Sequence, residues 1–241
     1  MGSDKETIES YSRYAEQWAE RKKTGGNPFH EYLSPQMFRR VPNLAGKTVV
    51  CVGCGAGEEC QHLYQLGAER VIGTDLSEGL LNHAKQTYPN LTFCNMDMEN
   101  LSFVDESVDF VFSNLAFHYV ESWQAIFGSV KRILKPGGRL LFSTHHPVKW
   151  GAEFGKDENE RYHILGYKKY PKTGKFEVFG DYLNPRLVDD TWFDDFHVKY
   201  YHRSLTAMMR DVIQSGMTLV DFDEPKPIEE AKTEDPAFYE I

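Results

Sequence analysis

A glycine-rich turn that directly follows a short apolar run constrains the fold of this chain most. The run Lys47–Val52 (KTVVCV) is apolar and β-branched, which is typical of a strand buried on both faces of a parallel sheet. The next residues, Gly53–Gly57 (GCGAG), include three glycines, which allow the backbone to turn tightly and approach a ligand closely. Open α/β sheets bind their ligands at the carboxyl ends of strands, so a ligand site is expected here.

Strands and helices are predicted to alternate through the middle of the chain. The predicted strands are 47–52, 70–75, 91–94, 107–113 and 139–144, and the predicted helices are 58–66, 77–87 and 123–134. Ser77 is a typical N-cap residue, and Pro136-Gly137-Gly138 ends the last of these helices. The short links indicate an α/β fold: a Rossmann-like, mostly parallel sheet with helices on both faces.

The segments on either side of this core are predicted to be additions to it. Tyr11 and Trp18 lie on one face of an amphipathic helix predicted over 7–22, and Pro35 begins a second helix. The alternation stops after Thr144, and a long irregular stretch of this kind is usually functional or mobile. The elements predicted beyond that point are strand-like pieces at 176–182 and 196–201, a helix over 204–214 and a strand over 217–222.

The overall charge and composition exclude several classes of protein. A net charge of -9 over 241 residues, with no basic stripe, argues against a nucleic-acid partner. No apolar run approaches the roughly 20 residues of a membrane span, and the polar residues Met1–Glu9 do not resemble a signal peptide. Four cysteines do not make a disulfide framework in a chain of this size. We therefore expect a cytoplasmic protein.

Two ligand classes compete for the glycine turn. Asp75 ends the second predicted strand about 20 residues after the turn, where a carboxylate can hold a ribose hydroxyl pair. A dinucleotide fingerprint requires its third glycine at position 58, which is Glu58 here, and a carboxylate there would face the pyrophosphate. A cationic sulfonium cofactor tolerates the acidic pair Glu58 and Glu59. The turn therefore favours S-adenosylmethionine over a nicotinamide dinucleotide.

The chain resembles the class I S-adenosylmethionine-dependent methyltransferases through five motifs in the expected order. They are Gly53–Gly57, Gly73–Ser77 (GTDLS), Asn95–Leu101 (NMDMENL), Val108–Leu115 (VDFVFSNL) and Ile133–Gly138 (ILKPGG). The pairs His146-Pro147 and His202-Arg203 are similar to a bacterial subgroup that methylates small molecules. In that subgroup an N-terminal helix closes over the cofactor, which becomes S-adenosylhomocysteine after transfer.

The resemblance implies both a division of the chain and a set of cofactor contacts. The parts of a single domain are a helical lid (1–45), a cofactor-binding core (46–144), a substrate-side insertion (145–201) and a C-terminal helix and strand (202–241). The implied cofactor contacts are Tyr11, Trp18, His30, Gly53, Cys54, Gly55, Asp75, Leu76, Asp97, Met98 and Asn114. One departure is Cys51, which stands where the family usually has Asp or Glu, so backbone carbonyls near Gly53 and Asn114 are expected to hold the methionine ammonium.

Three histidines are candidates for a general base or a substrate contact. His118 follows the fourth predicted strand, His146 follows the fifth, and His202 precedes a helix, although packing, a turn or a helix cap also explains them. The aromatic residues of the insertion, Trp150, Trp192 and Tyr200, form either a wall around the acceptor or a packing core. No metal site is expected, because Cys51 and Cys54 lie at a buried strand end and no second pair is suitably spaced.

The leading interpretation is methyl transfer from S-adenosylmethionine to an oxygen, nitrogen or carbon atom of a small molecule. The alternatives are a non-catalytic protein that binds S-adenosylmethionine or S-adenosylhomocysteine and a nicotinamide-dependent oxidoreductase, which Glu58 opposes. RNA methylation is disfavoured by the negative charge. We expect no membrane partner, and either a monomer or a homodimer.

Overall fold

The computed structural model describes most of the chain. The described residues are 3–23, 27–148, 155–156, 162–163, 167–169, 173, 176–178 and 182–239. The predicted aromatic contact Trp150 lies outside them. Within the described part, no helix has the length and hydropathy needed to cross a membrane.

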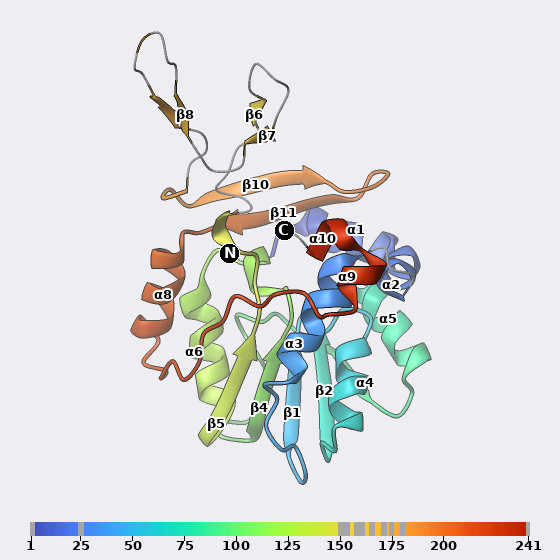
Figure 1. Ribbon diagram of the computed structural model, residues 1–241. Helices are drawn as coiled ribbons and strands as arrows, with labels where there is room; N and C mark the ends of the chain where they lie inside the picture. The colour runs from blue at the N-terminus through green and yellow to red at the C-terminus, as the bar shows by residue number, and fades with distance from the viewer. Residues whose placement is uncertain are drawn as a thin grey trace.

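A five-stranded parallel sheet forms the centre of the molecule, in the order β3-β2-β1-β4-β5 (Figure 1). The strands are β1 (Thr48–Val52), β2 (Arg70–Asp75), β3 (Thr92–Asn95), β4 (Val108–Ser113) and β5 (Leu134–Phe142). β1 lies between β2 and β4, so the strand order reverses there and leaves a crevice at the carboxyl ends of these strands. The predicted Rossmann-like fold is confirmed.

Helices cover both faces of this sheet because the side chains of β1 alternate between two cores. Val50 and Val52 pack with Ile126 of α6 (Trp123–Ile133), and Met208 of α8 (Leu205–Gln214) joins this cluster. Val49 and Cys51 point to the other face, where they pack with the apolar residues of α4 (Glu58–Gln65) and α5 (Glu78–Thr87). The buried run is therefore apolar throughout because each face has its own helical cover.

The last parallel strand begins earlier than the sequence predicts. β5 starts at Leu134, which pairs with Val108, and the register then shifts so that Arg139 pairs with Phe110. The Pro136-Gly137-Gly138 segment forms this irregularity, and Gly137 has a φ of 78°, which a side chain would strain. The regular ladder resumes at Arg139, where the predicted strand starts.

The N-terminal segment forms two helices, so the prediction of one continuous helix over 7–22 is corrected. α1 (Lys5–Arg13) and α2 (Ala15–Lys23) are separated at Tyr14, whose φ of -102° and ψ of 22° are not helical. The Asp4 side chain caps α1 by accepting a hydrogen bond from the backbone N–H of Thr7. A π-helical turn, η1 (Phe29–Leu33), leads into α3 (Ser34–Phe38), which begins close to the predicted position at Pro35.

The segment after residue 145 contributes an antiparallel hairpin above the carboxyl end of the sheet (Figure 1). Its strands are β10 (Arg186–Thr191) and β11 (His197–His202), and β11 corresponds to the predicted strand at 196–201. The short strands of this segment are β6 (Gly155–Lys156), β7 (Tyr162–His163), β8 (Tyr167–Lys169) and β9 (Phe176–Val178). β9 lies at the start of the predicted strand at 176–182, of which 179–181 lie outside the described residues.

The predicted C-terminal strand over 217–222 is wrong. These residues have no ladder partner in the described part of the chain, and Leu219 and Val220 are exposed. The chain instead crosses towards α3, where Arg40 pairs with Asp221 and Asp223 at 3.2 and 2.5 Å (Figure 1). The acidic, proline-containing sequence favours these ion pairs over a ladder, and the chain ends in α9 (Ala231–Glu234) and α10 (Pro236–Tyr239).

Candidate cofactor site

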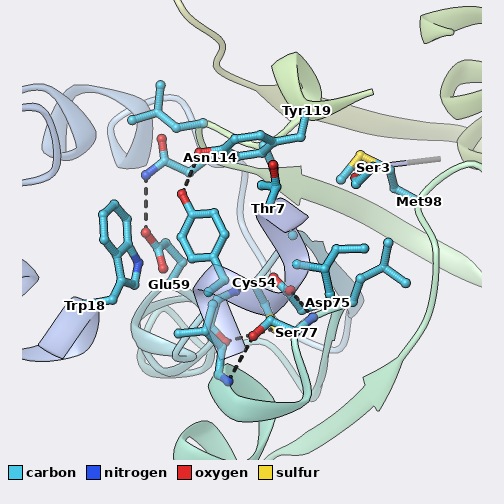
Figure 2. A pocket seen from close by; sticks show the side chains of 18 of the residues that line it. Ser3, Thr7, Trp18, Cys54, Glu59, Asp75, Ser77, Met98, Asn114 and Tyr119 are labelled. Atoms are coloured by element: carbon cyan, nitrogen blue, oxygen red, sulfur yellow. Dashed lines mark hydrogen bonds between the residues drawn. The ribbon is translucent and has the colours of Figure 1, made fainter. Parts of the chain in front are cut away.

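A cavity lies at the carboxyl ends of β1, β2 and β4, beneath α1 and α2. It has about 760 Å³ of empty volume, part of which is open to solvent. Its floor comes from the glycine turn and from the ends of the strands, and its cover comes from Thr7, Tyr11 and Trp18 of the N-terminal helices. Figure 2 shows Asp75 and Met98 on one side of the cavity and Glu59 and Trp18 on the other.

The glycine turn forms the floor of this cavity with backbone atoms. Gly53 has a φ of 65°, and a Cβ atom added to it would overlap the Cβ of Ala116. Gly55 also has a positive φ, 53°, but a Cβ atom there would meet nothing within 4 Å. Position 53 therefore requires glycine, because any side chain would be strained by the positive φ and would collide with Ala116.

Asp75 lies at the end of β2 and is held by backbone N–H groups. Its Oδ2 accepts a hydrogen bond from the N–H of Gly55, and its Oδ1 accepts one from the N–H of Ser77, both at 2.9 Å. Burial raises the pKa of Asp75, and these N–H donors partly offset the effect. The carboxylate is therefore fixed in place, with Met96 and Met98 beside it as apolar surfaces for a flat ring.

The opposite end of the cavity contains a buried ion pair. The Nζ atom of Lys22, from α2, donates to Oε1 and Oε2 of Glu59 at 3.0 and 3.2 Å and to Oε2 of Glu58 at 3.2 Å. Burial opposes the charge on Glu59, but Lys22 outweighs it and holds the pKa of Glu59 well below its usual range. Likewise, the charges of Glu59 and Glu58 outweigh burial and raise the pKa of Lys22.

Asn114, just after β4, connects this ion pair to the sheet. Its Nδ2 donates to Oε1 of Glu59 at 3.2 Å and to Oγ of Ser34 at 2.9 Å, while its Oδ1 accepts from Oγ of Ser143 at 2.7 Å. His30 Nδ1 lies 3.5 Å from Glu59 Oε1. Burial, together with the charge of Lys22, lowers the pKa of His30, so its imidazole is neutral at pH 7.

Aromatic side chains from three segments cover the cavity. The hydroxyls of Tyr11 and Tyr119 are 2.5 Å apart, and burial raises the pKa of both. The Tyr11 ring also meets Phe196 edge-on at 4.9 Å, and Trp18 stacks on Trp192 at 5.5 Å. The N-terminal helices, the segment after β4 and the β10–β11 hairpin therefore form one aromatic cover.

All but one of the predicted cofactor contacts line this cavity. The predicted residues on its wall are Tyr11, Trp18, His30, Gly53, Cys54, Gly55, Asp75, Leu76, Met98 and Asn114. Asp97 is not on the wall, and its Oδ1 accepts a hydrogen bond from the N–H of Glu99 at 2.9 Å. Its neighbours Met96 and Met98 line the cavity instead.

The three histidines predicted to be catalytic lie elsewhere. His118 is buried and stacks on His145 with 3.6 Å between ring centroids, but it does not line the cavity. His146 is exposed, and its Nε2 lies 2.7 Å from Oε1 of Glu224. His202 is buried, and its Nε2 lies 2.9 Å from the carbonyl oxygen of Tyr182. A catalytic role for these histidines stays a prediction, and their described contacts lie outside the cavity wall.

Among the other aromatic predictions, Trp192 joins the cavity cover and Tyr200 is buried with its hydroxyl donating to Asp190 at 2.8 Å. Cys51, Cys54 and Cys60 are free thiols buried together in the core. Within the described residues, no group of His, Cys, Asp and Glu side chains has the arrangement of a metal site.

The polar lining residues that were not predicted as contacts include Lys22, Glu59 and Tyr119. Glu59 was visible only as part of an acidic pair, and its partner Lys22 is 37 residues away in the chain. Tyr119 lies next to the predicted candidate His118, and of the two it is Tyr119 that lines the cavity.

The comparisons with known proteins agree with this geometry. Residues 50–142 match the family described as "Methyltransferase domain". "Putative methyltransferase 235L" of Invertebrate iridescent virus 6 is 33% identical over 181 residues, which are 72% of this chain and 68% of that relative. The crystal structure of an S-adenosylmethionine-dependent methyltransferase from Mesorhizobium loti is similar with a TM-score of 0.70 and 28% identity, over 90% of this chain and 93% of that one.

The chain therefore belongs to the S-adenosylmethionine-dependent methyltransferases. A malonyl-[acyl-carrier protein] O-methyltransferase from Yersinia pestis is 39% identical over 99 residues, which are 41% of this chain and 37% of that relative. The likeness to this enzyme covers well under half of its length.

The cavity fits the cofactor of this family, S-adenosylmethionine. A Cβ atom at Gly55 would meet nothing within 4 Å, so the turn leaves open space beside its backbone for a ligand. Asp75 is suited to hold the ribose hydroxyls, Met96 and Met98 to hold the adenine, and the acidic end at Glu59 to face the cationic part.

Proposed function

We propose that this protein transfers a methyl group from S-adenosylmethionine to a small molecule that carries an oxygen, nitrogen or carbon nucleophile. The observation that carries this proposal is the aromatic cover, formed by Tyr11, Trp18 and Tyr119 over the cavity. A cover made of packed rings supports a small acceptor group beside the cofactor over an RNA chain. The net charge of -9 supports the same conclusion against RNA.

S-adenosylmethionine supplies a methyl group that is already activated by a sulfonium charge. The protein's own contribution is to hold the acceptor in line and to exclude water, which together can account for about 7–11 kcal/mol of the barrier. The buried pair of tyrosine hydroxyls and the stacked tryptophans are placed for both tasks. Burial raises the pKa of Tyr11 and of Tyr119, so both hydroxyls are protonated near pH 7. One of them donates to the other, which leaves a single O–H to donate to an acceptor.

The described wall of the cavity favours an acceptor that needs no general base. Its one imidazole, His30, is engaged with Glu59 and Asn114 on the side of the ion pair. A carboxylate acceptor is already ionised at neutral pH, and tyrosine hydroxyls are suitable donors for it. The relatives named as malonyl-[acyl-carrier protein] O-methyltransferases support a carboxylate as the first acceptor class to test.

The experiment is an acceptor screen with S-adenosylmethionine, in which S-adenosylhomocysteine release and product mass are both measured. We expect turnover with a set of small carboxylic acids, and a rate that stays constant above the pKa of the acid. Tyr119→Phe should lower that rate while cofactor affinity changes little. Cofactor binding without turnover of any acid, alcohol, phenol, amine or carbon acid would favour the non-catalytic alternative.

A further inference from the structure

The Lys22–Glu59 ion pair lies where the cofactor pocket meets the N-terminal helices, and it is almost closed to solvent. The side chains of Lys22 and Glu59 are 8% and 10% exposed. Both line the cavity that also contains Asp75, whereas Glu58, which contacts the same Nζ atom, does not line it. A charged pair on a ligand-facing wall offers groups of both signs to whatever enters.

The charges in this cluster do not balance. Glu58 and Glu59 carry two negative charges against the single positive charge of Lys22, and His30 is neutral at pH 7. One negative charge is therefore left over beside a largely buried group, which is costly unless a cation joins it. The nearest other donor to Glu59 is the neutral amide of Asn114.

The position of the pair within the cavity indicates which part of a nucleoside ligand it meets. Asp75 and Met98 lie at one side and Glu59 and Asn114 at the other (Figure 2). A nucleoside whose ribose hydroxyls bind Asp75 directs its 5′ substituent away from the adenine side, along the glycine turn. In S-adenosylmethionine and S-adenosylhomocysteine that substituent ends in an α-ammonium and an α-carboxylate.

We propose that Glu59 and Lys22 together form the binding site for the amino-acid part of the cofactor, an inference that rests on the proposed function. Glu59 accepts hydrogen bonds from the α-ammonium, and the Nζ atom of Lys22 donates to the α-carboxylate. Asn114, held by Ser34 and Ser143, fixes the carboxylate of Glu59 for this contact. This assignment replaces the expectation that backbone carbonyls alone hold the ammonium, and Cys51, buried in the core, takes no part.

The proposal predicts selectivity between two ligands that share the same nucleoside. S-adenosylhomocysteine has the amino-acid part, and 5′-methylthioadenosine lacks it. The test is calorimetric titration of both ligands into the wild-type protein and into Glu59→Gln, which keeps the size of the side chain and removes its charge. Glu58→Gln is the matched control, because Glu58 also contacts Lys22 but lies off the cavity wall.

We expect Glu59→Gln to weaken S-adenosylhomocysteine binding by about 10- to 100-fold, the effect of losing a charged hydrogen bond. Its affinity for 5′-methylthioadenosine should stay within about 2-fold of wild type, and Glu58→Gln should leave both affinities within about 3-fold. If Glu59→Gln does not fold by circular dichroism, Lys22→Gln provides the second variant, with the same selective loss expected.

Two outcomes would overturn the inference alone. Equal loss of both ligands would mean that Glu59 serves only to tie α2 to α4, and no loss of either would mean that it does not meet the ligand. A wild-type protein that binds neither ligand would instead contradict the proposed function itself, and this inference with it.

Discussion

The two ends of the cavity are held by different kinds of contact. At the Asp75 end, a side chain from β2 is fixed by backbone N–H groups of the glycine turn and of the α5 N-terminus. At the Glu59 end, the contacts join side chains of α2, α3, α4 and the ends of β4 and β5 that are 29 to 80 residues apart in the chain. The first end is part of the sheet core, and the second is complete only when the N-terminal helices are docked.

A close approach between two helices positions that N-terminal cover. α1 passes over α5 at Gly79, where an added Cβ atom would overlap the carbonyl group of Ser12. The hydroxyls of Ser12 and Ser77 are 3.0 Å apart at the same crossing. We therefore expect mutations in the sheet core to affect the whole ligand site, and mutations in the N-terminal cover to act through the docking of α1 and α2.

The largest effect is expected from Gly53→Ala, at the floor shared by both ends. The substitution forces a side chain into a positive-φ conformation and against Ala116, so cofactor affinity should fall by more than about 100-fold. The free energy of unfolding should fall by about 2–4 kcal/mol, measured by denaturant titration. Gly55→Ala, which is strained but meets nothing within 4 Å, is the control and should cost about 1–2 kcal/mol.

A smaller effect, confined to the cover, is expected from Gly79→Ala. The new methyl group pushes α1 away from α5, because the atoms that it meets are backbone atoms of Ser12 and cannot move alone. S-adenosylhomocysteine affinity should fall by about 10-fold, and amide hydrogen exchange should increase in 5–23 but not in the sheet. Gly128→Ala is the control, because Gly128 lies on α6 with open space around it, and it should leave amide exchange unchanged. If Gly79→Ala also increased exchange in the sheet, the separation between the sheet core and the N-terminal cover would be contradicted.

The paired hydroxyls of Tyr11 and Tyr119 provide a more modest test of the contact between cover and core. Tyr11→Phe or Tyr119→Phe leaves one buried hydroxyl without its partner and should lower the free energy of unfolding by about 1–3 kcal/mol. The double variant removes both groups and should recover part of that loss. Additive losses in the double-mutant cycle would show that the two hydroxyls are not coupled.

The smallest effect concerns pH and the Glu59 end. The pKa of Glu59 lies below its ordinary value of 4.5, so the folded state binds this proton less readily than the unfolded state does. The ion pair therefore stabilises the fold above about pH 4.5, and this contribution is lost as the pH falls towards the folded-state pKa. The free energy of unfolding, measured by thermal unfolding at pH 7, should be about 1 kcal/mol higher for wild type than for Glu59→Gln. This difference should become smaller below pH 4.5. If the stability difference between wild type and Glu59→Gln grows as the pH falls, the ion pair of Glu59 does not stabilise the fold in this way.

The Asp75 end could be predicted from the sequence because its determinants are local. A buried strand, a glycine turn and a carboxylate at the next strand end occur within about 25 residues, and each follows from short-range backbone rules. The same locality explains why the order of strands and helices from 47 to 144 agrees with the structure. The early start of β5 was missed because a register shift in a ladder has no local signal.

The Glu59 end could not be predicted, because its partners meet only in three dimensions. Lys22 has no sequence signal that distinguishes it from a solvated lysine, and Asn114 was expected only through the resemblance. The wrong strand at 217–222 has a similar origin: its apolar residues fit a strand, but Asp221 within it and Asp223 just after it pair with Arg40 of another segment. Tertiary contacts outweighed local preference in both places.

The most direct test of the central claim is calorimetric titration of the wild-type protein with S-adenosylmethionine, S-adenosylhomocysteine and NADH under identical conditions. We predict micromolar binding of both sulfur compounds and no binding of NADH, because the carboxylate of Glu59 on the cavity wall repels a pyrophosphate. Binding of NADH, or failure to bind either sulfur compound, would contradict the central claim.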